Sequence, residues 1–144
     1  DLFAGTGQLG IEALSRGASS ATFVDRRADA IRLIRDNLKT TDLTDRARVI
    51  AGDSMEYLNK VREKFDIIFL DPPYEAGLLE PALRQIARFD ILNPHGIIVA
   101  ESPADRVLPA LAAPYGIRRA YRYGRIGLTV YSRAAEKKDG ENDQ

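Results

Sequence analysis

The feature that most constrains the fold is a run of four apolar residues, 67 to 70, that ends at an acid. The run reads Ile-Ile-Phe-Leu and offers apolar side chains to both faces of a strand. That pattern is typical of a central parallel strand covered by helices on both sides. Asp71 follows directly, and a charge at such a place is costly unless it is paired or functional. We therefore expect a central strand over 65–71 with a functional acid at its carboxyl end.

Strand and helix patterns alternate along most of the remaining chain. Strands are predicted over 1–4, 20–25, 47–51, 65–71 and 96–101, and helices over 8–16, 27–39, 53–61, 77–88 and 106–113. Residues 93–96 have the composition of a turn. Such alternation predicts an α/β fold with a mostly parallel sheet and helices on both faces. Two alternating segments, 117–123 and 128–133, predict a C-terminal antiparallel hairpin instead of a final strand–helix unit.

The length of 144 residues suits one domain, which we expect to span 1–133. The charged residues 134–144 are expected to form a disordered tail. The chain begins with Asp1 and not with Met, and the predicted first strand has only four residues before Gly5. Because buried strands typically have about 5–6 residues, we expect an upstream segment to be missing. The α-amino charge of Asp1 is then expected to disturb the nearby site and weaken ligand binding.

Composition excludes several classes of site and partner. The chain has no cysteine, which excludes disulfides, thiolate metal sites and a cysteine nucleophile. His95 is the single histidine and has no histidine or cysteine partner, so we expect no metal. No apolar run approaches the ~20 residues of a membrane span, and there is no signal peptide, so a cytoplasmic monomer without membrane contact is expected. The net charge is zero, so a nucleic-acid partner would need a local basic patch.

A glycine-rich segment follows the predicted first strand. Residues 5–10 read Gly-Thr-Gly-Gln-Leu-Gly, a pattern that fits either a dinucleotide site or another nucleotide-like cofactor. Gly5 and Gly7 let the backbone approach a ligand where open α/β sheets bind one. Asp25 ends the second predicted strand, and its carboxylate can accept both hydroxyls of a ribose.

Asp53 and Ser54 follow the third predicted strand. Asp53 is a good candidate for the N-cap of the next helix. It can also hold the amino group of an adenine, and one position serves both roles. We therefore include both residues among the candidate cofactor contacts.

The segment 71–74, Asp-Pro-Pro-Tyr, is the most informative motif. Pro72 and Pro73 fix the backbone and remove two N–H donors, which leaves carbonyl oxygens as rigid acceptors. The carboxylate of Asp71 adds an acceptor, and the ring of Tyr74 offers a stacking surface. This combination suits a planar group that bears an –NH2, held so that its nitrogen lone pair can attack a methyl group.

These motifs resemble the bacterial small-subunit (16S) ribosomal RNA (guanine-N2)-methyltransferase family. The resemblance rests on residues 1–7, 10–18 and 71–74 and extends to about residue 133. It implies a Rossmann-like class I fold that uses S-adenosylmethionine, with ribosomal RNA or an assembling small subunit as partner. It also implies a role for each candidate residue. The cofactor contacts are Asp1, Phe3, Gly5, Gly7, Asp25, Asp53 and Ser54, and the target guanine meets Asp71, Pro72, Pro73 and Tyr74.

Two other readings stay open at this point. One is a different amino-group methyltransferase, acting on adenine N6 or on a glutamine side chain. The other is a nicotinamide-dependent oxidoreductase or a non-catalytic nucleotide-binding module, which the glycine pattern permits. The Asp-Pro-Pro-Tyr motif and the closing hairpin favour a methyltransferase over this second class.

The predicted hairpin carries four arginines, Arg118, Arg119, Arg122 and Arg125, interleaved with tyrosines. Arginine with aromatic neighbours suits RNA binding. A solvated sheet face is an equally good interpretation, because charge runs often only solvate a surface. Strand alternation sends Arg118 and Arg122 to one face and Arg119 to the other.

Overall fold

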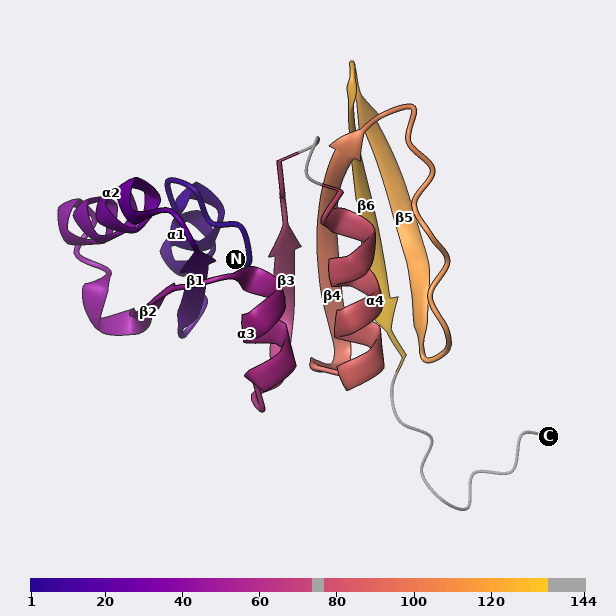
Figure 1. Ribbon diagram of the computed structural model, residues 1–144, viewed down its shortest axis with the longest axis horizontal. Coiled ribbons are helices and arrows are strands. Elements are labelled where there is room, and N and C mark those ends of the chain that lie inside the picture. The colour runs from indigo at the N-terminus through magenta and orange to yellow at the C-terminus, as the bar shows by residue number, and fades with distance from the viewer. Residues whose placement is uncertain (74–76, 135–144) are drawn as a thin grey trace.

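The computed structural model describes residues 1–73 and 77–134. The described helices are α1 (Gln8–Ser15), α2 (Ala28–Thr40), the short 3-10 helix η1 (Thr44–Arg46), α3 (Ser54–Lys60) and α4 (Leu79–Phe89). The strands are β1 (Ala21–Asp25), β2 (Ala47–Ala51), β3 (Phe65–Leu70), β4 (Leu92–Pro103), β5 (Tyr115–Tyr123) and β6 (Ile126–Arg133) (Figure 1). Most predicted elements are present to within about two residues.

The strands form one two-stranded and one four-stranded sheet, β1-β2 and β3-β4-β6-β5. β1–β2 and β3–β4 pair in parallel, whereas β6 is antiparallel to both β4 and β5. The predicted α/β architecture with a closing antiparallel hairpin is therefore confirmed.

Residues 1–4 lie between the two sheets and join them. The N–H of Leu2 donates to the carbonyl of Phe69 of β3 at 3.2 Å. On the other side, the N–H of Ala4 donates to Val24 of β1, and the N–H of Val24 donates to Asp1, both at 3.0 Å. Residues 2 and 3 are assigned as turn and not as strand. The segment is nevertheless bonded to both β1 and β3, which is the central position expected for it.

Helices pack on both faces of β1. Phe23 is fully buried in a cluster with Leu14 of α1 and Ile34 of α2. The next residue, Val24, points to the opposite face and lies in a second cluster with Leu58 of α3. Because adjacent strand residues face opposite sides, these two clusters are the two cores expected for a sheet between helices.

The expectation that β3 is buried on both faces is wrong for its outer face. Ile68 and Leu70 are buried under α3 and α4, but Ile67 is 45% exposed. The other two described α-helices, α1 and α2, pack on β1 and β2 and not on β3. The apolar run of β3 therefore has one face that no described helix covers.

Two local predictions are also wrong. Residues 106–113 form no helix, because Pro109 cannot donate an N–H and its carbonyl instead accepts from the hydroxyl of Tyr131 at 2.7 Å. The expected turn at 93–96 lies within β4. It still departs from regular strand geometry, since the β3–β4 register shifts there and His95 has φ 65°.

The buried Arg133 of β6 connects the C-terminal hairpin to the end of α4. Arg133 donates from Nε and Nη2 to the two carboxylate oxygens of Asp90, at 2.7 and 2.9 Å. The hydroxyl of Tyr115 donates to the same carboxylate at 2.7 Å. These donors hold the pKa of Asp90 well below its usual range. The result is a fixed position for β5 and β6 relative to the rest of the sheet.

Candidate active site

A cavity of about 750 Å³ opens at the carboxyl ends of β1, β3 and β4. Open α/β sheets bind ligands at this edge. The cavity brings together most of the residues predicted from the sequence. These are Asp1, Phe3, Gly5, Asp25, Asp53, Ser54, Asp71, Pro72 and Pro73.

Asp25 is the anchor of the glycine-rich loop. Its Oδ2 accepts the N–H of Gly5 at 2.9 Å, and its Oδ1 accepts the N–H of Arg27 at the same distance. The Nε of Arg27 also lies 3.6 Å from Oδ1. Asp25 is only 9% exposed, so it is not an ordinary surface acid. A carboxylate has about four lone-pair sites, so it keeps acceptor capacity for a bound hydroxyl.

Asp1 connects the cavity to helix α1. Its Oδ2 accepts the N–H of Gly10 at 3.3 Å, while Oδ1 is buried and has no hydrogen-bond partner among the described residues. Its α-amino group donates to the carbonyl of Thr22 at 3.0 Å. Burial lowers the pKa of this amine to about 5. The effect of this group on ligand binding, expected from the sequence, stays a prediction.

Asp53 and Ser54 lie where β2 leads into α3. The Oδ1 of Asp53 accepts the N–H of Glu56 at 3.0 Å, which makes it the N-cap of α3 as predicted. Ser54 is buried, and its hydroxyl donates to the carbonyl of Leu2. Both residues line the cavity, and the hydroxyl of Ser54 connects α3 to residues 1–4.

The segment after β3 forms the opposite wall. Asp71, Pro72 and Pro73 line the cavity directly after the buried Leu70. Burial and the nearby negative charge of Glu101 both raise the pKa of Asp71. Tyr74 lies outside the described residues, so its predicted stacking role stays a prediction.

Gly7 is not among the residues that line the cavity. It has φ 81° and is the N-cap of α1, so it turns the chain into the helix. A Cβ added there would lie 3.3 Å from the side chain of Ile34 in α2. Its position in the structure thus serves the turn and the packing of α1 on α2.

Sequence reasoning missed several residues that line the cavity. They are Ala4, Thr6, Gln8, Leu9, Arg26, Arg27, Leu78 and Glu101. For Glu101 a signal was available, because it belongs to a predicted buried strand and ends an apolar stretch, as Asp25 and Asp71 do. Acids at the ends of neighbouring parallel strands meet at one edge of the sheet.

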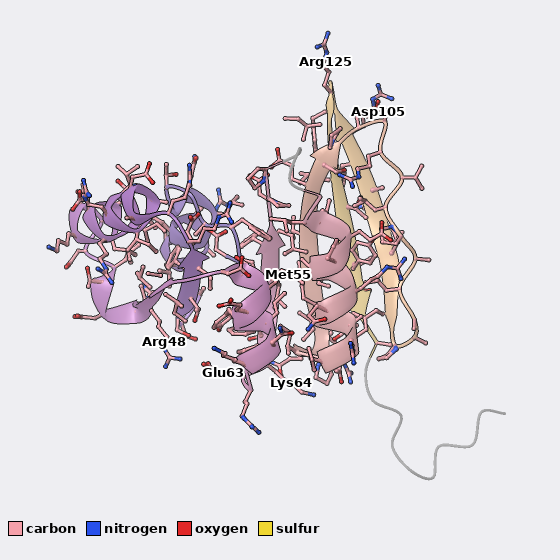
Figure 2. All side chains as sticks on the ribbon, viewed as in Figure 1. Arg48, Met55, Glu63, Lys64, Asp105 and Arg125 are labelled. Carbon is pink, nitrogen blue, oxygen red and sulfur yellow. The ribbon has the colours of Figure 1, made fainter. Side chains whose placement is uncertain are left out.

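The hairpin arginines lie outside the cavity. Arg119, Tyr121 and Tyr123 form what we call the β5 surface: the guanidinium of Arg119 lies 5.5 Å from the ring centroid of Tyr121. The rings of Tyr121 and Tyr123 are stacked, with centroids 6.4 Å apart and an interplanar angle of 17°. Arg125 projects from the tip of the hairpin (Figure 2). Arg122 donates to the carbonyl of Gly124 at 3.2 Å.

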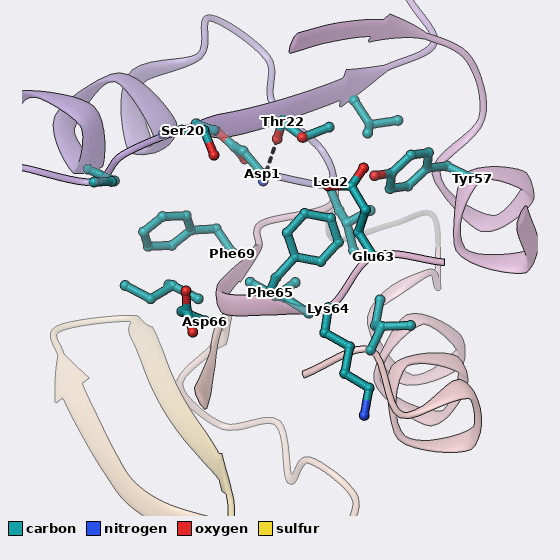
Figure 3. A pocket seen from close by; sticks show the side chains of 18 of the residues that line it. Asp1, Leu2, Ser20, Thr22, Tyr57, Glu63, Lys64, Phe65, Asp66 and Phe69 are labelled. Carbon is teal, nitrogen blue, oxygen red and sulfur yellow. Dashed lines mark hydrogen bonds between the residues drawn. The ribbon is translucent and has the colours of Figure 1, made fainter. Parts of the chain in front are cut away.

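A second cavity of about 320 Å³ lies between β1 and β3, on the side of residues 1–4 away from the first. Phe65 and Phe69 of β3 lie on one side of it, with Asp1 and Thr22 on the other (Figure 3). The hydroxyl of Tyr57 at its edge is buried without a hydrogen-bond partner among the described residues. The first residues of β1 and β3 pair with β2 and β4 on their far edges, and the cavity lies between their facing edges.

Residues 1–73 and 77–134 contain no group of three or more metal-ligating side chains. None of the helices in those ranges is both long and apolar enough to cross a membrane.

Comparison with known proteins gives strong matches over nearly the whole chain. The family model described as "Conserved hypothetical protein 95" matches residues 1–132. YlbH of Bacillus subtilis is 40% identical over 136 residues, which cover 92% of this chain and 74% of that protein. The Escherichia coli protein named "Ribosomal RNA small subunit methyltransferase D" is 35% identical over 144 residues, 99% of this chain and 70% of that protein.

Solved structures agree with the fold. A conserved hypothetical protein from Streptococcus pyogenes superposes with a TM-score of 0.86 at 33% identity and covers 92% of this chain and 83% of its own. An RNA methyltransferase from Salinibacter ruber, solved with S-adenosyl-L-homocysteine, gives a TM-score of 0.69 at 12% identity, with 98% and 83% coverage. The fold is that of the class I methyltransferases.

Proposed function

This chain belongs to the conserved hypothetical protein 95 family, and from that premise we propose that it is an S-adenosylmethionine-dependent methyltransferase of small-subunit ribosomal RNA. Its target is the exocyclic N2 amino group of a guanine. The relatives' names support the first statement, and the resemblance of residues 1–7, 10–18 and 71–74 supports the second.

One observation carries the proposal. The cavity that holds the Asp25-anchored glycine loop also holds Asp71, Pro72 and Pro73 on its opposite wall. A nucleotide-like cofactor and an amino-bearing base would therefore meet inside one space. Hydride transfer by a dinucleotide oxidoreductase does not require the rigid hydrogen-bond acceptors that Asp71, Pro72 and Pro73 place in this cavity.

The residues present fit the cofactor. Asp25 is nearly buried, is oriented by two backbone N–H groups and has acceptor capacity for ribose hydroxyls. Gly5 lines the cavity without a side chain, and Asp53 offers an acceptor for the adenine amino group. Bound S-adenosylmethionine supplies a methyl group made electrophilic by its sulfonium charge. No metal is needed for that chemistry.

The protein's contribution is to position the amine. The lone pair of an exocyclic amino group is delocalised into its ring, and acceptors on both N–H bonds turn it toward the methyl carbon. Asp71 and the carbonyls of the proline segment are these acceptors in our proposal. As the nitrogen takes a methyl group in place of a hydrogen, the carboxylate of Asp71 would accept the released proton. Orientation of this kind can supply much of the rate.

The ring of Tyr74 completes the target site in this proposal by stacking on the base. The β5 surface is our candidate for contact with the flanking RNA, because arginine and tyrosine side chains there are already stacked and exposed. Stacking on aromatic side chains is how proteins hold unpaired bases.

The test is to map the methylated base by mass spectrometry after incubation with labelled S-adenosylmethionine. The substrates are naked small-subunit ribosomal RNA and assembling small-subunit particles. The proposal expects one labelled N2-methylguanosine. Label on adenine would refute the guanine assignment, and no label on either substrate would refute the function.

Asp71→Ala is the matched variant for that experiment. Loss of the amine acceptor should lower turnover by about 100-fold or more, as misplacement of a reacting group does. Its affinity for S-adenosylmethionine should fall far less, because Asp71 holds the target amine. Equal losses in both would mean that Asp71 serves the cofactor.

A further inference from the structure

Glu101 of β4 lies beside Asp71 at the edge of the sheet. β3 and β4 are parallel, with Phe69 opposite Val99 and Leu70 opposite Ala100. The next residue of each strand is then Asp71 and Glu101. Aligned residues on neighbouring strands point to the same face, and both of these acids line the 750 Å³ cavity.

The closeness of these two acids has an electrostatic consequence in the structure. Glu101 contributes to the raised pKa of Asp71, so the two carboxylates interact. The arginines of the cavity come from the other side, after β1, where Arg27 pairs with Asp25. The wall formed by β3 and β4 therefore carries two acidic acceptors, and the other described residues that line it, Pro72, Pro73 and Leu78, bring no side-chain donor.

A wall of acceptors distinguishes between bases. The edge of guanine carries adjacent donors, the N1–H and the N2 amino group. In adenine the position next to the amino group is N1, which is an acceptor. An ionised carboxylate only accepts hydrogen bonds, so two carboxylates side by side match the guanine edge and repel the lone pair of adenine N1.

We propose that Glu101 accepts the N1–H of the target guanine while Asp71 accepts from the N2 amino group. Glu101 is then a specificity-determining residue that selects guanine over bases with an unprotonated ring nitrogen. This inference rests on the proposed function, since it assigns one contact within the same target site. Enzymes that act on a single base commonly read its Watson–Crick edge in this way.

The test compares two forms of one RNA fragment. The fragment carries the mapped target either as guanine or as 2-aminopurine, which keeps the 2-amino group but has no hydrogen on N1. The wild-type chain should prefer guanine in kcat/KM by about 10- to 150-fold, the value of one charge-assisted hydrogen bond. The variant E101Q should reduce that preference several-fold, because glutamine can donate to the bare N1. 2-Aminopurine also lacks O6, but that difference is common to both proteins and cancels when their preferences are compared.

The control variant is E80Q on α4, which removes an exposed acid that pairs with Arg84 outside the cavity. It should keep the wild-type preference. Affinity for S-adenosylmethionine and the thermal midpoint of E101Q should match the wild type, which separates the removal of one hydrogen bond from damage to the fold.

Two results would overturn the inference, and they differ. If the wild type forms N2-methylguanosine and E101Q keeps the full preference for guanine, Glu101 does not read N1 and only this inference fails. If the wild type methylates neither form of the fragment, the proposed function fails as well. A changed preference in E101Q with unchanged cofactor affinity supports the contact.

Discussion

The main-chain N–H of Gly5 lies 2.9 Å from Oδ2 of Asp25, so the acid that ends β1 holds the glycine loop directly. The other carboxylate oxygen holds the N–H of Arg27 at the start of α2. Asp25 therefore organises the backbone on two sides of the cavity. A ligand that donates a hydrogen bond to Asp25 would therefore bind a carboxylate that two backbone N–H groups already hold in one orientation.

The first prediction concerns Asp25→Ala. S-Adenosylmethionine should bind about 10- to 150-fold more weakly, since a hydrogen bond to a charged group contributes about 1.5–3 kcal/mol. Two backbone N–H groups also lose their acceptor, so the free energy of unfolding should fall by about 1–3 kcal/mol. Calorimetry and thermal unfolding measure the two effects. Asp36→Ala on the exposed side of α2 is the control, and unchanged cofactor affinity in Asp25→Ala would rule out the ribose role.

The second prediction concerns Gly10→Ala in α1. A Cβ at Gly10 would lie 2.7 Å from Cζ of Phe23, whose ring is fully buried. Glycine to alanine in an open helix stabilises by about 1 kcal/mol, whereas overpacking a core costs about 1–3 kcal/mol. We expect net destabilisation in urea unfolding. Gly116→Ala, where a Cβ meets nothing within 4 Å, should be near neutral, and a stabilised Gly10→Ala would mean that α1 can move away from β1.

The positions of Asp25, Asp71 and Glu101 show which parts of the site the sequence can predict. The sequence places acids at strand ends and glycines after the first strand, and the topology of a parallel sheet brings such positions to one edge. Asp25 and Asp71 were found by that rule, and Glu101 obeys it too. What sequence cannot supply is the register of β3 on β4, which decides that Glu101 is level with Asp71.

The failed predictions have a common physical cause. Apolar periodicity reports which residues can be buried but not what covers them. Ile67 fits a buried strand, yet its face of β3 meets no described helix. The segment 106–113 has helical spacing, yet Pro109 and its bond to Tyr131 give it another conformation. Both outcomes depend on partners that are distant in the sequence.

The third prediction concerns the β5 surface. If it contacts RNA, replacing Arg119 by Gln and Tyr121 by Ala together should weaken binding and reduce its salt dependence. Removing one contact to a phosphate of single-stranded RNA lowers the slope of log K against log salt by about 0.7, and removing the stacking costs about 1–3 kcal/mol per base. Filter binding at several salt concentrations measures both.

The hairpin supplies its own control for that experiment. Arg122 faces the other side of β5 and donates to the carbonyl of Gly124, so Arg122→Gln removes the same charge from a different face. It should change binding less than the double variant. Equal effects would point to general electrostatic attraction, and no effect in either would locate RNA binding elsewhere on the molecule.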